Sequence, residues 1–183
     1  EMDRLRHLAT HDDRTDLLRP QIFQDQMRSH FSAAQRHGLD LALLLIDLDD
    51  FGRVNKRHDH TVGDRVITHV GNIIRGTLRA EDVAGRIGGD EFAVLLPFTR
   101  NYDAAHVVRR LLDQIRELSS EILPAGSNLV VSASIGFETC HGGDLESVEQ
   151  LRLNAEDALR RAKREGGDRG VYFRSVSDSP SPA

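Results

Sequence analysis

Residues 86–97 read RIGGDEFAVLLP, in which two glycines and an acidic pair separate two apolar runs. Residues 83–87 and 92–96 have the apolar, β-branched character of strands, and Gly88 with Gly89 predicts a hairpin connection between them. A hairpin tip holds its side chains in fixed positions, and glycine lets a bulky ligand come close to the backbone. The stretch therefore predicts two paired strands whose connection can form part of a site.

The acidic pair Asp90 and Glu91 concentrates negative charge at this connection. Repulsion between two carboxylates does not stabilise a fold, whereas a divalent cation would relieve it and could bridge to a phosphate. A solvated turn is an equal alternative on this stretch alone, because Asp and Gly favour turns.

Composition limits the class of protein. A chain of 183 residues is long enough for one domain with a substantial core. The formal net charge of -5 argues against a dedicated nucleic-acid binder. The single cysteine, Cys140, excludes an internal disulfide framework and fits a reducing cytoplasm. No apolar stretch reaches membrane-spanning length and no secretory signal opens the chain, so we expect a cytoplasmic segment without membrane contact.

The apolar spacing predicts helices and strands in an α+β order with a mostly antiparallel sheet. Helices are expected at residues 1–10, 21–37 and 50–60, after Gly63 and Asp64 as far as residue 78, and at residues 104–118 and 147–165. Strands are expected at residues 39–48, 83–87, 92–96, 128–139 and 171–173. We expect residues 1–10 to end an N-terminal connecting helix, residues 11–174 to form the domain, and residues 175–183 to be a disordered tail.

Asp47 stands at the end of the continuous apolar run at residues 39–48. Such a run suits a central strand that is buried on both faces. A carboxylate there is costly unless something pairs with it, so a metal explains Asp47 better than capping of the next helix does. The topology can bring Asp47 beside Asp90 and Glu91, and a carboxylate cluster of this kind is typical of two-metal phosphoryl chemistry.

With these motifs in place, the chain resembles the GGDEF family of diguanylate cyclases, whose signature is present letter for letter at residues 88–92. The resemblance covers about residues 9–173. It implies a palm-like central sheet, shared with nucleotidyl cyclases and polymerases. It also implies condensation of two GTP into cyclic di-GMP with release of pyrophosphate, using Mg²⁺ or Mn²⁺. Each domain holds one GTP, so the resemblance implies a homodimer, and it implies an N-terminal sensory module outside this chain.

The family pattern D-x-D-x-F-K-x-x-N-D is similar to residues 47–56. It implies that Asp47 is a metal ligand and that Leu48 supplies a backbone carbonyl ligand. Asn55 and Asp64 fall on the pair that reads guanine, and an amide with a carboxylate complements the guanine edge where adenine would leave both unpaired. Helix capping is the plainer interpretation of both residues.

The resemblance further implies that Asp90 and Glu91 are the metal-binding and catalytic acids. By position Asp90 can help deprotonate the attacking 3′-hydroxyl, although which group acts is left open. Gly88, Gly89 and Lys163 are implied to bind GTP.

Arg79 and Asp82 match the family's RxxD inhibitory site, where the product cyclic di-GMP binds. Arg79 can donate two parallel hydrogen bonds to a phosphate or to the edge of a guanine, and Asp82 can accept hydrogen bonds from a guanine. A second arginine, Arg109 or Arg110, would complete the site across a dimer. The plainer interpretation is a surface ion pair.

The chain departs from the family at three places. Gly52 and Gly167 replace a lysine and an arginine that contact the triphosphate, and the turn at residues 12–20 keeps only Asp12, Thr15 and Leu17 of its pattern. Each lost charge-assisted contact costs about 1.5–3 kcal/mol, or roughly one to two decades in affinity. Two interpretations follow: a feedback-inhibited diguanylate cyclase with a weakened hold on GTP, which the retained acids favour, or a non-catalytic domain that binds cyclic di-GMP or GTP.

Overall fold

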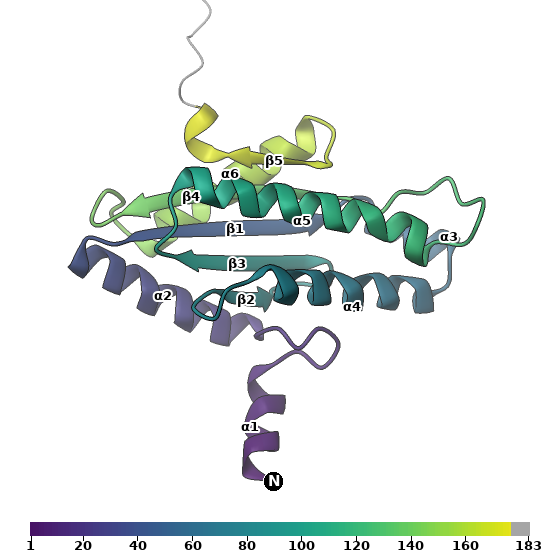
Figure 1. Ribbon diagram of the computed structural model, residues 1–183, viewed down its shortest axis with the longest axis horizontal. Coiled ribbons are helices and arrows are strands. Elements are labelled where there is room, and N and C mark those ends of the chain that lie inside the picture. The colour runs from purple at the N-terminus through teal and green to yellow at the C-terminus, as the bar shows by residue number, and fades with distance from the viewer. Residues whose placement is uncertain (177–183) are drawn as a thin grey trace, which may run out of the picture.

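The computed structural model of the chain describes residues 1–176, in which five strands form one sheet in the order β2-β3-β1-β4-β5 (Figure 1). The strands are β1 Asp40–Leu48, β2 Val83–Arg86, β3 Glu91–Pro97, β4 Ala133–His141 and β5 Arg169–Tyr172. Every neighbouring pair is antiparallel except β4 and β5, which are parallel. The predicted α+β class with a mostly antiparallel sheet is confirmed.

Six α-helices and one 3₁₀ turn complete the part of the chain that is described. They are α1 Met2–Thr10, α2 Pro20–His37, α3 Phe51–Arg57, α4 His60–Thr77, α5 Asn101–Ile122, α6 Val148–Arg164 and the 3₁₀ turn η1 Phe173–Val176. No helix within residues 1–176 has both the length and the apolar character that a membrane crossing requires.

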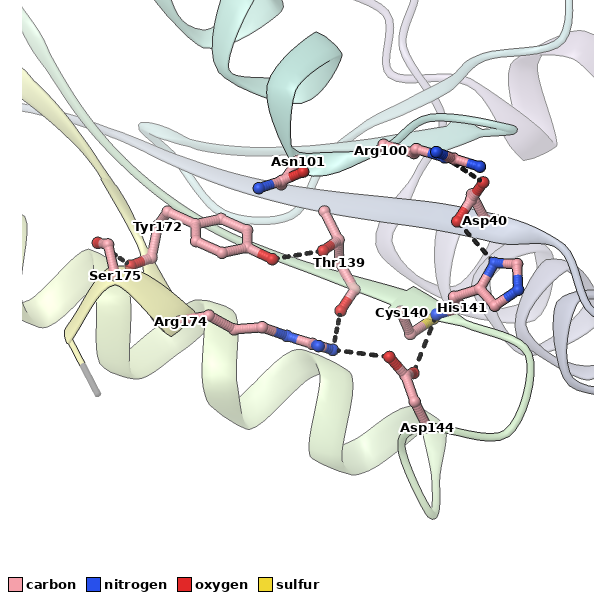
Figure 2. Close-up of a pocket in the computed structure, with 10 residues that line it drawn as sticks. All are labelled: Asp40, Arg100, Asn101, Thr139, Cys140, His141, Asp144, Tyr172, Arg174 and Ser175. Atoms are coloured by element: carbon pink, nitrogen blue, oxygen red, sulfur yellow. Dashed lines mark hydrogen bonds and ion pairs between the residues drawn. The ribbon is translucent and has the colours of Figure 1, made fainter. Parts of the chain in front are cut away.

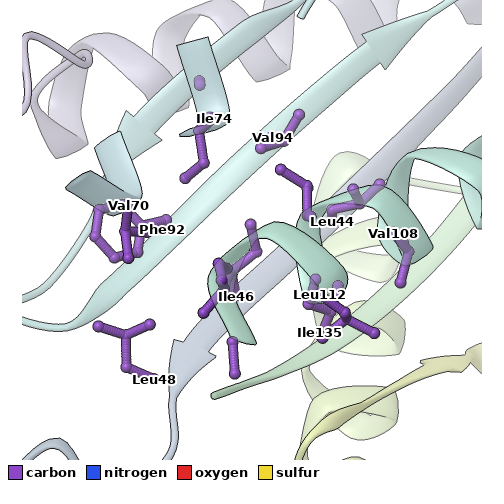
Figure 3. Packing of buried hydrophobic residues seen from close by; sticks show 14 of the residues in the cluster. Leu44, Ile46, Leu48, Val70, Ile74, Phe92, Val94, Val108, Leu112 and Ile135 are labelled. Carbon is purple, nitrogen blue, oxygen red and sulfur yellow. The ribbon is translucent and has the colours of Figure 1, made fainter. Parts of the chain in front are cut away.

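The central strand β1 is buried on both faces, as its apolar run predicted. Side chains alternate along a strand, so Leu44 and Ile46 join a core with α4 and α5 (Figure 3), whereas Leu43 and Leu45 join a second core with α2 and α6. The sheet therefore lies between two helical layers, and its strand ends are left to carry a site.

The predicted starts of one strand and one helix were wrong. Strand β4 begins at Ala133 and not at residue 128, because the backbone before it is bound by groups outside the sheet ladder: Val131 N–H donates to Ser119 Oγ and the Ser132 carbonyl accepts from Asp49 N–H. Helix α4 begins at His60, so Asp64 lies inside its first turns and does not cap it.

The end of the domain also differs from the prediction. The last strand starts two residues early, at Arg169, and Phe173 already belongs to the 3₁₀ turn. This turn includes Ser175 and Val176, the first two residues of the predicted tail. The remainder of that tail, residues 177–183, lies outside the described residues.

The turn at residues 12–17 runs along helix α4. Arg14 forms an ion pair of 2.8 Å with Asp64, and Asp16 forms one of 3.4 Å with Arg75 near the other end of the helix. Between these pairs, the buried side chain of Thr15 packs against Gly71. The turn thus contacts α4 at three points.

Asp16 also links this turn to α1. Its carboxylate lies 2.5 Å from His7 Nε2, and His7 stacks on His11 with ring centroids 4.0 Å apart. Asp16 has φ +60°, a left-handed conformation that an aspartate adopts more readily than most residues. Helix α1 buries none of its own side chains, so these polar contacts, with Arg19 donating to the Leu8 carbonyl, join it to the domain.

Candidate functional site

The predicted hairpin is formed by β2 and β3, and it carries the acidic pair to the end of β1. Asp47 on β1 lies opposite Glu91 on β3 in the antiparallel register. Leu48 N–H donates to the Asp90 carbonyl at 3.1 Å, which joins the two strand ends directly. Residues 87–90 connect the strands, and Arg86 Nη2 fixes this connection by donating to the Gly89 carbonyl at 2.7 Å. The structure therefore brings Asp47, Leu48, Asp90 and Glu91 to one place.

The acids at this place repel one another. Burial raises the pKa of Asp47, the charges of Asp90 and Asp49 raise it further, and Lys163 opposes this shift. The pKa of Glu91 is also raised, first by burial of its carboxyl and then by the charges of Asp47 and Asp90. Both shifts mean that the charged form is disfavoured, first by burial and then by the neighbouring negative charges, which Lys163 only partly offsets.

The raised pKa of Glu91 leads to a prediction about stability. Because the pKa of Glu91 is higher in the folded protein than in the unfolded chain, ionisation of its carboxyl destabilises the folded state. This destabilisation is absent at a pH below the ordinary pKa of 4.5 and reaches its full size at a pH above the raised pKa of the folded protein. In the absence of divalent cations we expect Glu91→Gln to melt above the wild type at pH 7. This advantage should vanish as the pH falls below about 4.5. Melting curves at pH 4 and pH 7 measure both effects.

A matched control is Glu117→Gln, which changes an exposed acid on α5. We expect the melting temperature of this variant to equal that of the wild type at both pH values. A Glu91→Gln protein that melts below the wild type at pH 7 would contradict the electrostatic account of the site.

Lys163, near the end of α6, contacts the same group of oxygens. Its Nζ lies 3.0 Å from Asp47 Oδ1, 3.4 Å from the Leu48 carbonyl oxygen and 3.3 Å from Asp49 Oδ1. The oxygens predicted to bind a metal thus already accept a positively charged group.

Carboxylate and carbonyl oxygens are the ligands that Mg²⁺ and Mn²⁺ prefer, so the donor set at Asp47, Leu48, Asp90 and Glu91 fits such an ion. Within residues 1–176, no three His, Cys, Asp or Glu side chains are already spaced as the ligands of a metal ion.

Asp49 has a role that the sequence analysis did not find. Its carboxylate accepts hydrogen bonds from the hydroxyls of Ser132 at 2.9 Å and Ser134 at 2.7 Å, and from Asp168 N–H at 2.8 Å. Burial acts to raise the pKa of Asp49, but the donation from Ser134, Asp168 and Ser132, together with Lys163, lowers it overall. Asp49 therefore joins the end of β1 to the start of β4 and to the turn after α6.

Gly167 is part of this arrangement. It has φ +72°, and a Cβ added to it would lie 2.9 Å from Asp49 Oδ1. The backbone can bring the Asp168 amide onto Asp49 because no side chain stands at residue 167. The glycine that removes an expected phosphate contact thus allows a hydrogen bond at the site.

The predicted guanine pair lies on two neighbouring helices. Asn55 is on α3 and packs against Gly63 of α4 so closely that a Cβ at Gly63 would lie 1.7 Å from Asn55 Oδ1. Asp64, next to Gly63, is exposed and paired with Arg14. Asn55 Oδ1 is buried with no hydrogen-bond partner, and an unsatisfied buried oxygen of this kind needs an explanation such as a binding role.

Arg79 and Asp82, the residues of the RxxD motif, are held together by hydrogen bonds. Asp82 Oδ2 accepts from Arg79 N–H at 2.8 Å and from Arg79 Nε at 3.5 Å, while Arg79 Nη2 donates to Thr99 Oγ1 at 2.8 Å. The Asp82 side chain is 3% exposed and its Oδ1 has no hydrogen-bond partner. Both residues line a pocket of about 400 Å³ that also includes Arg75 and Asp16.

Arg110 is not brought into that pocket within one chain. It is exposed on α5 and does not line the pocket. Its predicted contribution across a dimer stays a prediction.

A different pocket, of about 490 Å³, lies at the other end of β1 (Figure 2). Its charged side chains are paired with one another: Asp40 with Arg100 and His141, and Arg174 with Asp144. None of the predicted site residues lines it.

Comparison with known proteins shows what the chain is similar to. A sequence model of the family described as "Diguanylate cyclase, GGDEF domain" matches residues 9–169. The chain is 34% identical over 169 residues to the cyclic di-GMP phosphodiesterase NbdA of Pseudomonas aeruginosa, covering 92% of this chain and 21% of NbdA. It is 32% identical over 168 residues to the bifunctional diguanylate cyclase/cyclic di-GMP phosphodiesterase MucR of the same organism, covering 92% of this chain and 24% of MucR.

Among solved structures, the coiled coil and GGDEF domain of DgcB from Caulobacter crescentus, in complex with c-di-GMP, superposes with a TM-score of 0.84. The two are 27% identical, and the match covers 93% of this chain and 89% of that chain. The chain itself spans a quarter or less of the length of NbdA and MucR.

Proposed function

The chain belongs to the diguanylate cyclase GGDEF-domain family, and from this premise we propose that it condenses two GTP into one cyclic di-GMP with release of two pyrophosphates. One observation carries the proposal: the antiparallel register sets Asp47 opposite Glu91, beside Asp90 and within reach of Lys163. A domain that served only as a receptor would not need this costly group of acids.

In the proposed reaction, Asp47, Asp90 and Glu91 with the Leu48 carbonyl would hold Mg²⁺ or Mn²⁺. Bound there, the ion would neutralise charge on the triphosphate. Asn55 and Asp64 would hold the guanine, and Lys163 with the backbone at Gly88 and Gly89 would position the phosphates. Asp90 or Glu91 would accept the proton of the 3′-hydroxyl that attacks the α-phosphate of the second GTP.

Each domain would hold one GTP, so the two nucleotides react only when two copies face each other. We therefore include a homodimer, at least a transient one, in the proposal. A cytoplasmic location and an N-terminal sensory module are further parts of it.

A second candidate is a non-catalytic domain that binds cyclic di-GMP or GTP. The specific observation in its favour is the absence of a side chain at Gly52 and Gly167, where the family has phosphate-contacting cations. Purified protein, stripped of bound nucleotide and incubated at high concentration with GTP and Mg²⁺, separates the two candidates. Formation of cyclic di-GMP supports the enzyme, and its absence would overturn that proposal.

Arg79→Ala is expected to relieve product inhibition. The substitution removes a guanidinium from the pocket beside Asp82, and loss of one charge-assisted contact costs roughly one to two decades in affinity. The cyclic di-GMP concentration that halves the initial rate should therefore rise about ten- to a hundredfold. Rates measured with added cyclic di-GMP provide the test.

Arg28→Ala is the control for this experiment, because Arg28 is an exposed arginine of α2 that pairs with Asp25. Unchanged inhibition of the Arg79→Ala enzyme would show that the RxxD residues are an ordinary surface pair.

A further inference from the structure

Lys163 lies on oxygens that belong to the proposed metal site. Its Nζ is 3.0 Å from Asp47 Oδ1 and 3.4 Å from the Leu48 carbonyl, two of the proposed ligands. Among residues 1–176, no other basic side chain forms an ion pair with Asp47. A lysine that is proposed to contact phosphate is therefore bound, without nucleotide, to the oxygens that would hold the cation.

A divalent cation on Asp47 cannot leave this ammonium group undisturbed. An ion bound about 2.1 Å from Asp47 Oδ1 would lie no more than about 5 Å from Nζ, which itself is 3.0 Å from that oxygen. Two positive groups this close in a partly buried site repel each other strongly. The lysine side chain is a flexible stem with one compact charge, so Lys163 can relieve the repulsion by moving.

We propose that Lys163 and the divalent cation exchange at Asp47. Without the cation, Lys163 neutralises Asp47; with it, the ammonium group leaves Asp47 and becomes available to the phosphates of the nucleotide. This inference rests on the proposed GTP site.

Lys163 needs to move only a short way in this exchange, because Asp49 is a second carboxylate beside it. It lies 3.3 Å from Lys163 Nζ, and its own position is fixed by Ser132, Ser134 and the Asp168 amide. Lys163 can give up Asp47 and still keep this second carboxylate. In this proposal Lys163 keeps its contact with Asp49 and exchanges its contact with Asp47.

The glycines at residues 52 and 167 increase the importance of this exchange. They leave Lys163 as the only one of three expected phosphate-contacting cations in this sequence. If the cation frees Lys163 for the phosphates, each ligand improves the binding of the other, which is positive coupling by linkage.

Binding of Mn²⁺ without nucleotide is the first test, measured by electron paramagnetic resonance on the whole chain. Lys163→Met removes the competing ammonium group and should bind Mn²⁺ at least about tenfold more tightly than the wild type. A non-hydrolysable GTP analogue should improve Mn²⁺ affinity of the wild type more than that of Lys163→Met. Arg164→Met is the matched control, since it removes a charge from the exposed next residue, which does not pair with Asp47, and should stay close to the wild type.

The second test follows Lys163 itself. The chain has only two lysines, Lys56 and Lys163, so a protein labelled with ¹³C at lysine Cε gives two side-chain signals, which Lys56→Arg assigns. Saturating Mg²⁺ should shift the Lys163 signal and leave that of Lys56 in place.

An Mn²⁺ affinity of Lys163→Met that is equal to or weaker than that of the wild type overturns the exchange, as does a Lys163 signal that Mg²⁺ does not move. Failure of either protein to bind Mn²⁺ also overturns it. Absence of cyclic di-GMP formation would refute the proposed enzyme but would leave both binding measurements valid, so the two failures are distinguishable.

Discussion

Asp47→Asn is expected to lower the rate of cyclic di-GMP formation by at least about a hundred- to a thousandfold, the usual cost of removing one group that stabilises charge at a reacting centre. The substitution keeps the size of the side chain and removes the charge that would hold the cation opposite Glu91. Because the pKa of Asp47 is already raised, neutral asparagine should not destabilise the fold. We therefore expect Asp47→Asn to have the melting temperature of the wild type and a strongly reduced rate of cyclic di-GMP formation.

Asp40→Asn is a matched control on the same strand. Asp40 is the first residue of β1 and pairs with Arg100 and His141, away from the proposed site. Its loss should leave the rate within about threefold of the wild type, since partly exposed ion pairs contribute little. If Asp47→Asn retained a rate in that same range, Asp47 would not be part of the reacting centre.

Gly136→Ala is expected to have the largest effect on stability. Gly136 lies in β4 opposite the backbone of α6, and a Cβ there would be 2.1 Å from Leu159 N and 2.4 Å from the Ala155 carbonyl oxygen. Backbone atoms cannot move aside as a flexible side chain can, so α6 would have to shift as a whole. We expect a loss of at least about 3 kcal/mol in the free energy of unfolding, the upper end of overpacking costs.

In a domain of this size that loss lowers the melting temperature by roughly 6–12 °C. Gly76→Ala is the control, because Gly76 is an exposed residue of α4 where an added Cβ meets nothing within 4 Å. It should leave stability unchanged or raise it by up to about 1 kcal/mol. A Gly136→Ala protein as stable as the Gly76→Ala protein would show that α6 does not lie as close to β4 as described.

Patterns within short stretches predicted much of the fold. The apolar run that became β1 and the glycine pair between β2 and β3 are local signals, and from them the sequence predicted that Asp47 can lie near Asp90 and Glu91. The structure adds the register, which sets Asp47 opposite Glu91. Helix spacing located α2, α5 and α6 to within a few residues.

Contacts between distant segments were not predictable in the same way. The start of β4 depends on two hydrogen bonds, one between Val131 and Ser119 on the preceding helix and one between Ser132 and Asp49, which is distant in the sequence. The position of Asp49 depends on Ser132, Ser134 and the Asp168 amide, of which only the alternation of the two serines is visible in the sequence. Likewise, the sequence shows only that Gly167 stands where the family has an arginine. The structure shows that its backbone conformation lets the Asp168 amide contact Asp49.

The three contacts between the turn at residues 12–17 and helix α4 have a mechanical consequence. Arg14 and Asp16 contact α4 at Asp64 and Arg75, which are roughly 16 Å apart along the helix axis. Asp16 also contacts His7 of α1, so α1, the turn and α4 are joined by one continuous set of side-chain contacts. We therefore expect a rotation of α1 to be felt at Asp64, the carboxylate proposed to read guanine, through these side-chain contacts.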